Sequence, residues 1–169
     1  MTPELTPDFP DAETLLAEAA TLTLPRFAEV EALELGRLML TLAQTRGLSV
    51  VINIRTADRT LFHASLPGTS PMNDRWAARK SATALFFHKA SLLVGVQNRQ
   101  KAATLALHGL SAETHADHGG AVPIVVDGAG LVAVATVSGL PQLHDHQLVV
   151  EGLRALKAAL SSRLRQDHK

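Results

Sequence analysis

Apolar residues recur along the first quarter of the chain at the spacing of one helical face. Leu35, Leu38 and Leu42 lie three or four residues apart, and charged or polar residues fill the positions between them. Gly47 follows the last apolar position and is a typical helix stop. This pattern predicts an amphipathic helix over residues 28–46.

Similar spacing and end signals predict the other helices. Asp11 and Asp74 are expected N-caps, and proline is favoured in the first turn of a helix. The predicted segments are residues 11–22, residues 74–90, residues 97–110 and a C-terminal helix that Pro141 opens.

Strand-like segments occur in two pairs, each joined by a short polar or glycine-containing turn. Residues 48–55 and 59–66 flank the turn TADR, and residues 120–126 and 131–139 flank the turn DGAG. Paired neighbouring strands favour an antiparallel sheet, whereas parallel sheets alternate single strands with helices. The fold class expected from the pattern is therefore α+β.

Length and composition favour one globular domain. The chain has 169 residues, of which 46% are hydrophobic and 19% charged. We expect residues 1–24 to form an N-terminal arm with a short helix and residues 25–169 to form a single domain. No segment is apolar enough to span a bilayer, and the proline-rich start is unlike a signal peptide, so a cytoplasmic protein is expected.

Charge and cysteine content exclude several kinds of chemistry. Sixteen basic and sixteen acidic residues give zero formal net charge, and no basic stripe is present, which disfavours nucleic-acid binding. The chain contains no cysteine, so thiolate nucleophiles, iron–sulfur clusters and cysteine zinc sites are absent.

The segment HADHGG contains two histidines and two glycines immediately before a predicted strand. His115 and His118 are spaced i, i+3 and could share a metal ion with a third ligand such as Asp117 or His63. The alternative is that Gly119 and Gly120 (the latter already part of the strand segment) allow the backbone to approach a neighbour or a ligand closely. The sequence leaves both interpretations open.

A second histidine pair lies at the start of the C-terminal helix, in the motif LHDH. His144 and His146 are two residues apart, so on a helix they point to opposite sides and cannot readily share one ion. We expect His146 to lie on the core-facing stripe with a hydrogen bond to the backbone. Asp145 is expected to stabilise the helix N-terminus. Both Asp145 and His146 are thus assigned structural roles.

Two cations lie on an apolar, aromatic helix in the segment NDRWAARKSATALFFH. Lys80 follows Trp76 by four residues, and Arg79 is its neighbour. An unpaired buried charge is costly, so each cation needs a partner or access to water. One interpretation is a snorkelling lysine and a surface ion pair. The other is a cationic clamp for an anion, with Trp76 as an apolar wall and His118 as a hydrogen-bonding group.

Three motifs in this order resemble the haem-degrading-domain family, which includes GlcG-like and HbpS-like proteins. The motifs are LFHASLPGTSPMNDRWAARK, HGGAVPI and VSGLPQLHDHQLVVEGL. The resemblance covers roughly residues 25–160 and is closest to a bacterial cytoplasmic branch. It implies a profilin-like α+β fold, with an antiparallel sheet of about five strands and helices on both faces. It also implies a homo-oligomer, and haem as a ligand of some members.

These observations favour a non-catalytic or accessory domain that binds a small anionic ligand, with haem as one candidate, in a homodimer or larger homo-oligomer. The expected ligand-binding residues are Trp76, Arg79, Lys80, His118, Gly119 and Gly120. The alternatives are a metal-dependent enzyme that uses His115 and His118, and a purely structural assembly subunit. No catalytic residue is assigned, and no resident metal site, nucleic-acid partner or membrane partner is expected.

Overall fold

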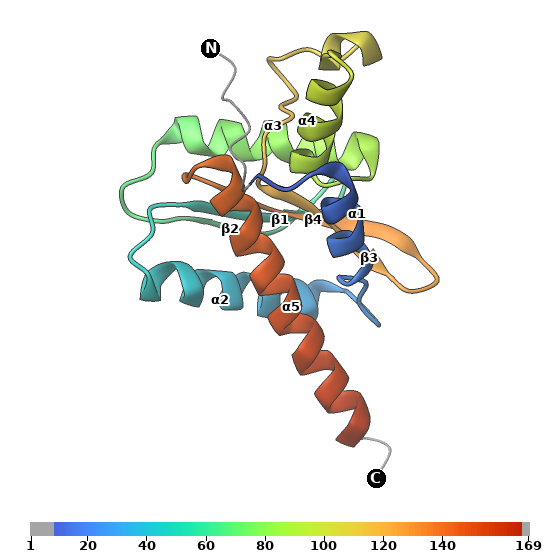
Figure 1. Ribbon diagram of the computed structural model, residues 1–169. Coiled ribbons are helices and arrows are strands. Elements are labelled where there is room, and N and C mark those ends of the chain that lie inside the picture. The colour runs from blue at the N-terminus through green and yellow to red at the C-terminus, as the bar shows by residue number, and fades with distance from the viewer. Residues whose placement is uncertain (1–8, 167–169) are drawn as a thin grey trace.

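The computed structural model (Figure 1) describes residues 9–166, which form an α+β fold. Its helices are α1 (Ala12–Ala20), α2 (Glu29–Thr45), α3 (Pro71–Phe87), α4 (Ser91–Gln100), the 3-10 helix η1 (Leu105–His108) and α5 (Gln142–Gln166). Its strands are β1 (Val51–Arg55), β2 (Thr60–Ser65), β3 (Ala121–Val126) and β4 (Gly130–Ser138).

All the strands pair antiparallel in the order β2-β1-β4-β3. Both predicted hairpins are confirmed, and β1 and β4 join them in the centre, where Val51 pairs with Ser138. The expectation of about five strands is wrong for the described residues, in which the sheet has four. In place of a fifth strand, Leu24 forms one isolated parallel bridge to Val126. Pro25 follows it and has no backbone N–H to continue the pairing.

Helices cover both faces of the sheet (Figure 1). Helices α2 and α5 cover one face and enclose the main core, to which both helices and all four strands contribute. Its largest fully buried side chains include Leu35, Met39, Ile52, Ile54, Ile124, Leu153 and Leu156. Helix α3 packs on the other face, where Ala84 contacts Ala121 and Val134 in a smaller cluster.

The helix boundaries on either side of α3 differ from the predicted ones. Helix α3 begins at Pro71 rather than after Asp74, because Ser70 is its N-cap. The backbone N–H of Ser70 donates to Asn73 Oδ1 at 2.9 Å, and this hydrogen bond stabilises the first turn of the helix. It ends at Phe87 because His88 adopts a left-handed conformation with φ 54°. The predicted helix over residues 97–110 is also wrong: α4 starts at residue 91, and a separate 3-10 turn follows it.

Helix α1 packs against α4 and so joins the N-terminal segment to the rest of the fold. Asp11 caps it as predicted, accepting a hydrogen bond from the Thr14 N–H at 2.8 Å. The buried Leu15 joins a cluster with Leu92 and Leu93 of α4. Within residues 9–166, no helix has the length and apolar character needed to cross a membrane.

Candidate functional site

Lys80 and Asp145 form a buried ion pair that joins α3 to the first turn of α5. Lys80 Nζ lies 2.7 Å from Asp145 Oδ2, and the two side chains are only 5% and 1% exposed. The lysine also donates to the Val137 carbonyl at 3.4 Å. Asp145 accepts from the backbone N–H of Leu140 at 2.9 Å, so it stabilises the turn before α5 as well as the lysine. Lys80 therefore does not snorkel to solvent.

Burial disfavours the charged form of both partners, and their mutual attraction opposes that effect. Desolvation lowers the pKa of Lys80, while the Asp145 carboxylate acts to raise it. Desolvation likewise raises the pKa of Asp145, and the ammonium acts to lower it. The consequence is a hydrogen-bonded ion pair in a low-dielectric environment. The Lys80 cation stays at the base of a pocket, and the Asp145 carboxylate neutralises most of the electric field of that cation.

The double glycine brings the start of β3 close to this pair. Gly120 has φ 138°, and a Cβ atom there would collide with the Val137 carbonyl and lie 2.9 Å from Lys80 Nζ. At Gly119 a Cβ atom would collide with the Gln142 carbonyl. Both glycines thus allow close approach to neighbouring protein groups, which is one of the two roles that the sequence suggests for them.

His118 lies against Trp76 at the edge of the same site. The two rings meet edge to face with centroids 5.2 Å apart. The buried Nδ1 atom of His118 has no hydrogen-bond partner among residues 9–166, and the nearest carboxylate oxygen, of Asp117, is 3.7 Å away. Desolvation lowers the pKa of His118; the Asp117 carboxylate opposes this shift, and the nearby cations Lys80, Arg99 and Arg79 add to it. The imidazole is therefore neutral at neutral pH and can act as a hydrogen-bonding group or a metal ligand.

The structure brings the WxxRK helix, the HGG turn and the start of α5 together around one pocket. Its volume is about 230 Å³. The residues that line it are Met72, Asn73, Trp76, Lys80, His118, Ser138, Gly139, Leu140, Gln142 and Asp145. We call this hollow the Lys80 pocket.

Arg79 lies on the other side of Trp76 and faces a second, larger groove. Its guanidinium carbon is 4.3 Å from the centre of the Trp76 ring, a cation–π geometry. This groove, of about 1010 Å³, we call the Arg79 groove. Its lining residues are Met72, Arg75, Trp76, Ala78, Arg79, Ala112, Glu113 and Thr114.

The charge of Arg79 is not neutralised by the protein in the way that the charge of Lys80 is. Among the described residues it has no carboxylate partner, and its buried Nε atom has no hydrogen-bond acceptor. An unpaired guanidinium beside an aromatic ring and a groove is able to bind a carboxylate or a phosphate with two parallel hydrogen bonds. Arg79 thus has a geometry suited to an anionic ligand.

Several residues of the two hollows were not assigned from the sequence. Gln142 accepts a hydrogen bond from the Gly119 N–H at 3.0 Å and so ties the HGG turn to α5. Met72 precedes Trp76 by four residues and Arg75 precedes Arg79 by four residues on α3, a spacing that could have placed them at the site. No local pattern, in contrast, indicates that Asp145 is the partner of Lys80.

The histidines that could have formed a metal site are held in different surroundings. His115 Nδ1 is 2.8 Å from the Thr114 hydroxyl, and its ring lies 6.1 Å from Phe86. His63, on β2, contacts Asp74 at 2.9 Å instead. In the part of the chain that the structure describes, no three histidine, aspartate or glutamate side chains gather at metal-binding distances.

His146 is buried on α5, whereas His144 is exposed. The expected backbone hydrogen bond of His146 is wrong: its Nε2 atom lies 2.6 Å from Glu18 Oε1, on α1. The hydrogen-bond partner is a carboxylate rather than a backbone group, because α1, which carries Glu18, packs over this part of α5. The hydrogen bond from His146 lowers the pKa of Glu18, which is therefore ionised at neutral pH.

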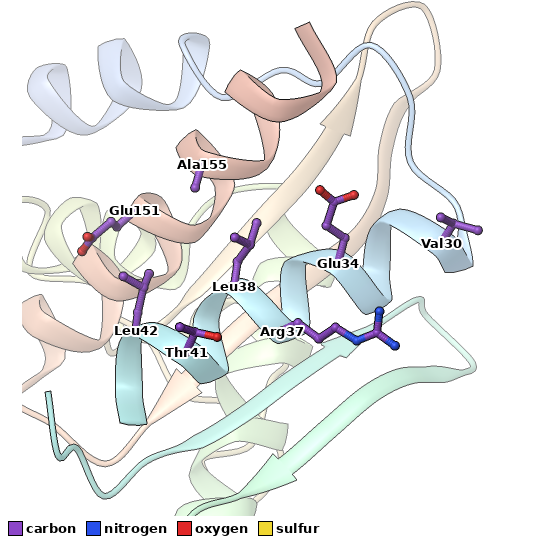
Figure 2. A pocket seen from close by; sticks show the side chains of 8 residues that line it. All are labelled: Val30, Glu34, Arg37, Leu38, Thr41, Leu42, Glu151 and Ala155. Carbon is purple, nitrogen blue, oxygen red and sulfur yellow. The ribbon is translucent and has the colours of Figure 1, made fainter. Parts of the chain in front are cut away.

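A further hollow lies between α2 and α5. Figure 2 shows Leu38 and Leu42 of α2 facing Ala155 of α5 across it, with Glu34 and Arg37 along one side. Its volume is about 440 Å³. Val30, at one end, is 71% exposed. We call this surface the α2–α5 groove.

The family model of the haem-degrading HbpS-like proteins matches residues 27–154. The chain belongs to this family. The match includes the Lys80 pocket and the Arg79 groove, but it begins after α1.

Relatives and solved structures agree with this membership. A UPF0303 protein of Burkholderia thailandensis is 44% identical over 146 residues, which cover 86% of this chain and 88% of that protein. One from Streptomyces avermitilis is 43% identical over 148 residues, or 87% and 89% of the two chains. The crystal structure of the Ybr137w protein superposes with a TM-score of 0.80 at 28% identity and covers 88% of each chain.

A PduOC:heme complex shares the fold of this HbpS-like protein. It superposes with a TM-score of 0.66 at 21% identity, covering 76% of this chain and 94% of that one. At this identity the likeness extends to the fold alone.

Proposed function

We propose that this HbpS-like protein is a non-catalytic or accessory domain that binds a small anionic ligand at Trp76. Arg79 receives the anionic group, Trp76 provides an apolar wall, and His118 provides a hydrogen bond or a ligand atom. The observation that carries the proposal is the half-buried Arg79 guanidinium, which stacks on Trp76 without a carboxylate partner among the described residues. Leaving such a charge unpaired is costly unless an anion or water completes it.

Lys80 contributes from the neighbouring pocket in a more limited way than the sequence suggests. An ammonium group has three N–H donors, of which Asp145 and the Val137 carbonyl take two. The third N–H is available to a ligand, but the ion pair reduces the attraction for a second anion. Gly119 and Gly120 do not line this pocket; their missing side chains allow the close approach of the Gln142 and Val137 carbonyls.

Haem is a specific candidate for this ligand, because the family is that of haem-degrading HbpS-like proteins and a structure of the same fold is a heme complex. The residues fit such a group: Arg75 and Arg79 can pair with its carboxylates, and neutral His118 or Met72 can ligate iron. His118 Nδ1 has no hydrogen-bond partner within residues 9–166. When bound, haem would supply a redox-active iron.

A hemin titration followed through the Soret band tests this function. We expect one-to-one binding that weakens in His118→Ala and in Arg79→Gln. His144→Gln is the matched control, because His144 is an exposed histidine on another element. If hemin binds equally well to all three variants, the Trp76 site does not bind haem. Retention of a smaller anion after isolation, measured by native mass spectrometry, would then distinguish a different ligand from none.

We further propose that the domain forms a homodimer or larger homo-oligomer through the α2–α5 groove. Support comes from its apolar floor of Leu38, Leu42 and Ala155 and from the exposed Val30 at its end (Figure 2). Apolar hollows of this kind often mark protein interfaces. Light scattering at micromolar concentration is expected to give at least twice the monomer mass, and Leu38→Glu should lower it. A monomer mass for the unaltered protein would refute self-association.

A further inference from the structure

The Lys80 pocket and the Arg79 groove meet along α3, because Met72 and Trp76 line both of them. A ligand with its anionic group at Arg79 can therefore extend past Trp76 into the pocket. The pocket has a volume of about 230 Å³, whereas a cavity on the order of 150 Å³ holds one benzene molecule, so a segment of the ligand fits there. The polar side chains of the pocket decide which chemical group that segment carries.

Two carboxamide side chains in the wall of the pocket are held in one orientation by the backbone. Asn73 Oδ1 accepts from the Ser70 N–H at 2.9 Å, and Gln142 Oε1 accepts from the Gly119 N–H at 3.0 Å. A backbone N–H can only donate, so the oxygen of each amide faces the backbone and the NH2 group is its free end. Both side chains are half-buried and line the Lys80 pocket.

The NH2 groups of Asn73 and Gln142 are unpaired and accessible. Neither forms a hydrogen bond with a described residue, and neither nitrogen is fully buried, so both can donate to water or to a ligand. Lys80 adds its third N–H, because Asp145 and the Val137 carbonyl take the other two. Three side chains of the pocket thus have N–H groups to offer a ligand.

The carboxylate of the pocket is already saturated with donors. Asp145 Oδ1 accepts from the Leu140 N–H at 2.9 Å, and Oδ2 accepts from Lys80 at 2.7 Å and from the Gly139 N–H at 3.4 Å. Because this carboxylate neutralises Lys80, the pocket adds little attraction for a second negative charge. A wall of N–H donors without net charge is complementary to a neutral acceptor, and a carbonyl oxygen accepts without having to donate.

We propose that the Lys80 pocket binds a neutral carbonyl group of the same ligand whose anionic group Arg79 receives. The ligand is then an anion that also carries a keto, ester or amide carbonyl. This inference rests on the proposed function for the position of the anion, and it adds the second recognised group. The carbonyl oxygen accepts from two of the donors of Asn73, Gln142 and Lys80, and Trp76 contacts the apolar segment between the two groups.

Oxo acids and their parent acids form matched probes, since a carbonyl oxygen replaces two hydrogens within each pair. The pairs 4-oxopentanoate with pentanoate and 6-oxoheptanoate with heptanoate vary the distance between the two groups. Trp76 is the only tryptophan and the chain has no tyrosine, so its fluorescence reports binding at this site. One added hydrogen bond corresponds to about two- to tenfold in affinity. At least one oxo acid should bind more tightly than its parent acid by such a factor.

Two variants test the donors and keep the amide oxygens in place. Asn73→Asp and Gln142→Glu each retain the oxygen that accepts from the backbone, and they turn the NH2 group into a second acceptor. Both should lose the preference for the oxo acid. Gln147→Glu is the matched control, because it makes the same change of charge at an exposed position of α5, and it should retain the preference. The readout is the ratio of the two affinities, since an added charge weakens both acids of a pair alike.

NMR of the nitrogen-15-labelled, unaltered protein gives a second readout, which still decides if a variant does not fold. The side-chain NH2 signals of Asn73 and Gln142 should shift more with the oxo acid than with the parent acid. Equal shifts would overturn the inference. So would 4-hydroxypentanoate binding as tightly as 4-oxopentanoate, because the pocket would then not select a carbonyl.

Arg79→Gln separates this inference from the proposed function. It should weaken an oxo acid and its parent acid alike and leave their ratio unchanged. Equal affinities within both pairs, each still lowered by Arg79→Gln, would overturn the carbonyl site and leave the anion site standing. A preference for the oxo acid that persists while Arg79→Gln changes neither affinity would refute the anion site and its link to the pocket. If none of the acids binds, the carbonyl site is overturned, and the hemin titration still tests the anion site.

Discussion

Removal of one partner of the Lys80–Asp145 pair is expected to destabilise the protein strongly. In Lys80→Met the Asp145 carboxylate, with a 1% exposed side chain, loses its cation and keeps only backbone donors, the N–H groups of Leu140 and Gly139. Breaking a buried ion pair on one side typically costs about 3–5 kcal/mol. Because two donors remain, we expect a cost near the lower end, about 3 kcal/mol.

Asp145→Leu should cost more than Lys80→Met, because it also removes the acceptor for the Leu140 N–H. The double variant Lys80→Met/Asp145→Leu replaces both charges by apolar groups of similar size. Such a replacement is often close to neutral, since no unpaired buried charge is left. Its free energy of unfolding should therefore lie nearer to that of the unaltered protein than either single variant does.

Urea denaturation followed by circular dichroism measures these values, provided that the unfolding slope stays constant. Domains of this kind unfold with about 5–15 kcal/mol, so the single variants should still fold. The reasoning fails if Lys80→Met costs less than about 1 kcal/mol, or if the double variant shows the sum of the single costs.

Three further outcomes follow from the same structure. The pKa of His118 is lower in the folded than in the unfolded protein, so its contribution to stability is present at neutral pH and is lost on acidification below its unfolded pKa. Between about pH 7 and pH 5, the free energy of unfolding should therefore fall less in His118→Gln than in the unaltered protein. Gly120→Ala should destabilise the protein more than Gly128→Ala does. Both glycines have positive φ, but only at Gly120 would the added Cβ collide with other atoms. The melting temperatures of the two variants test this difference. Glu151→Gln breaks an exposed ion pair with Arg46 and should cost at most about 1 kcal/mol in urea denaturation.

The strands could be predicted from the sequence because their signals are local. Alternating and β-branched residues on either side of a short turn specify a hairpin, and both hairpins form. The fifth strand had no such pattern and came only from the family resemblance. Helix ends were less predictable, since caps such as Ser70 with Asn73 compete with other candidates, and Asp74 was the wrong choice.

The site was predictable in its components and not in its pairings. Three motifs pointed to Trp76, Lys80 and His118, which the fold brings around one pocket. The partner of Lys80 lies 65 residues away, and Glu18 lies 128 residues from His146. Pairings over such separations depend on how α5 crosses the sheet and α1, which no local pattern encodes.

The pairing of Lys80 changes which cation at this site is available to a ligand. Two cations adjacent in sequence face different surroundings, because successive residues on a helix point about 100° apart. Lys80 points towards the sheet, where burial requires the Asp145 carboxylate. Arg79 points along the surface of Trp76, where the ring stacks on it but supplies no negative charge. A guanidinium stays protonated where an ammonium can lose its proton on burial. The structure therefore divides the pair into one cation that holds α3 to α5 and one that has no carboxylate partner among the described residues.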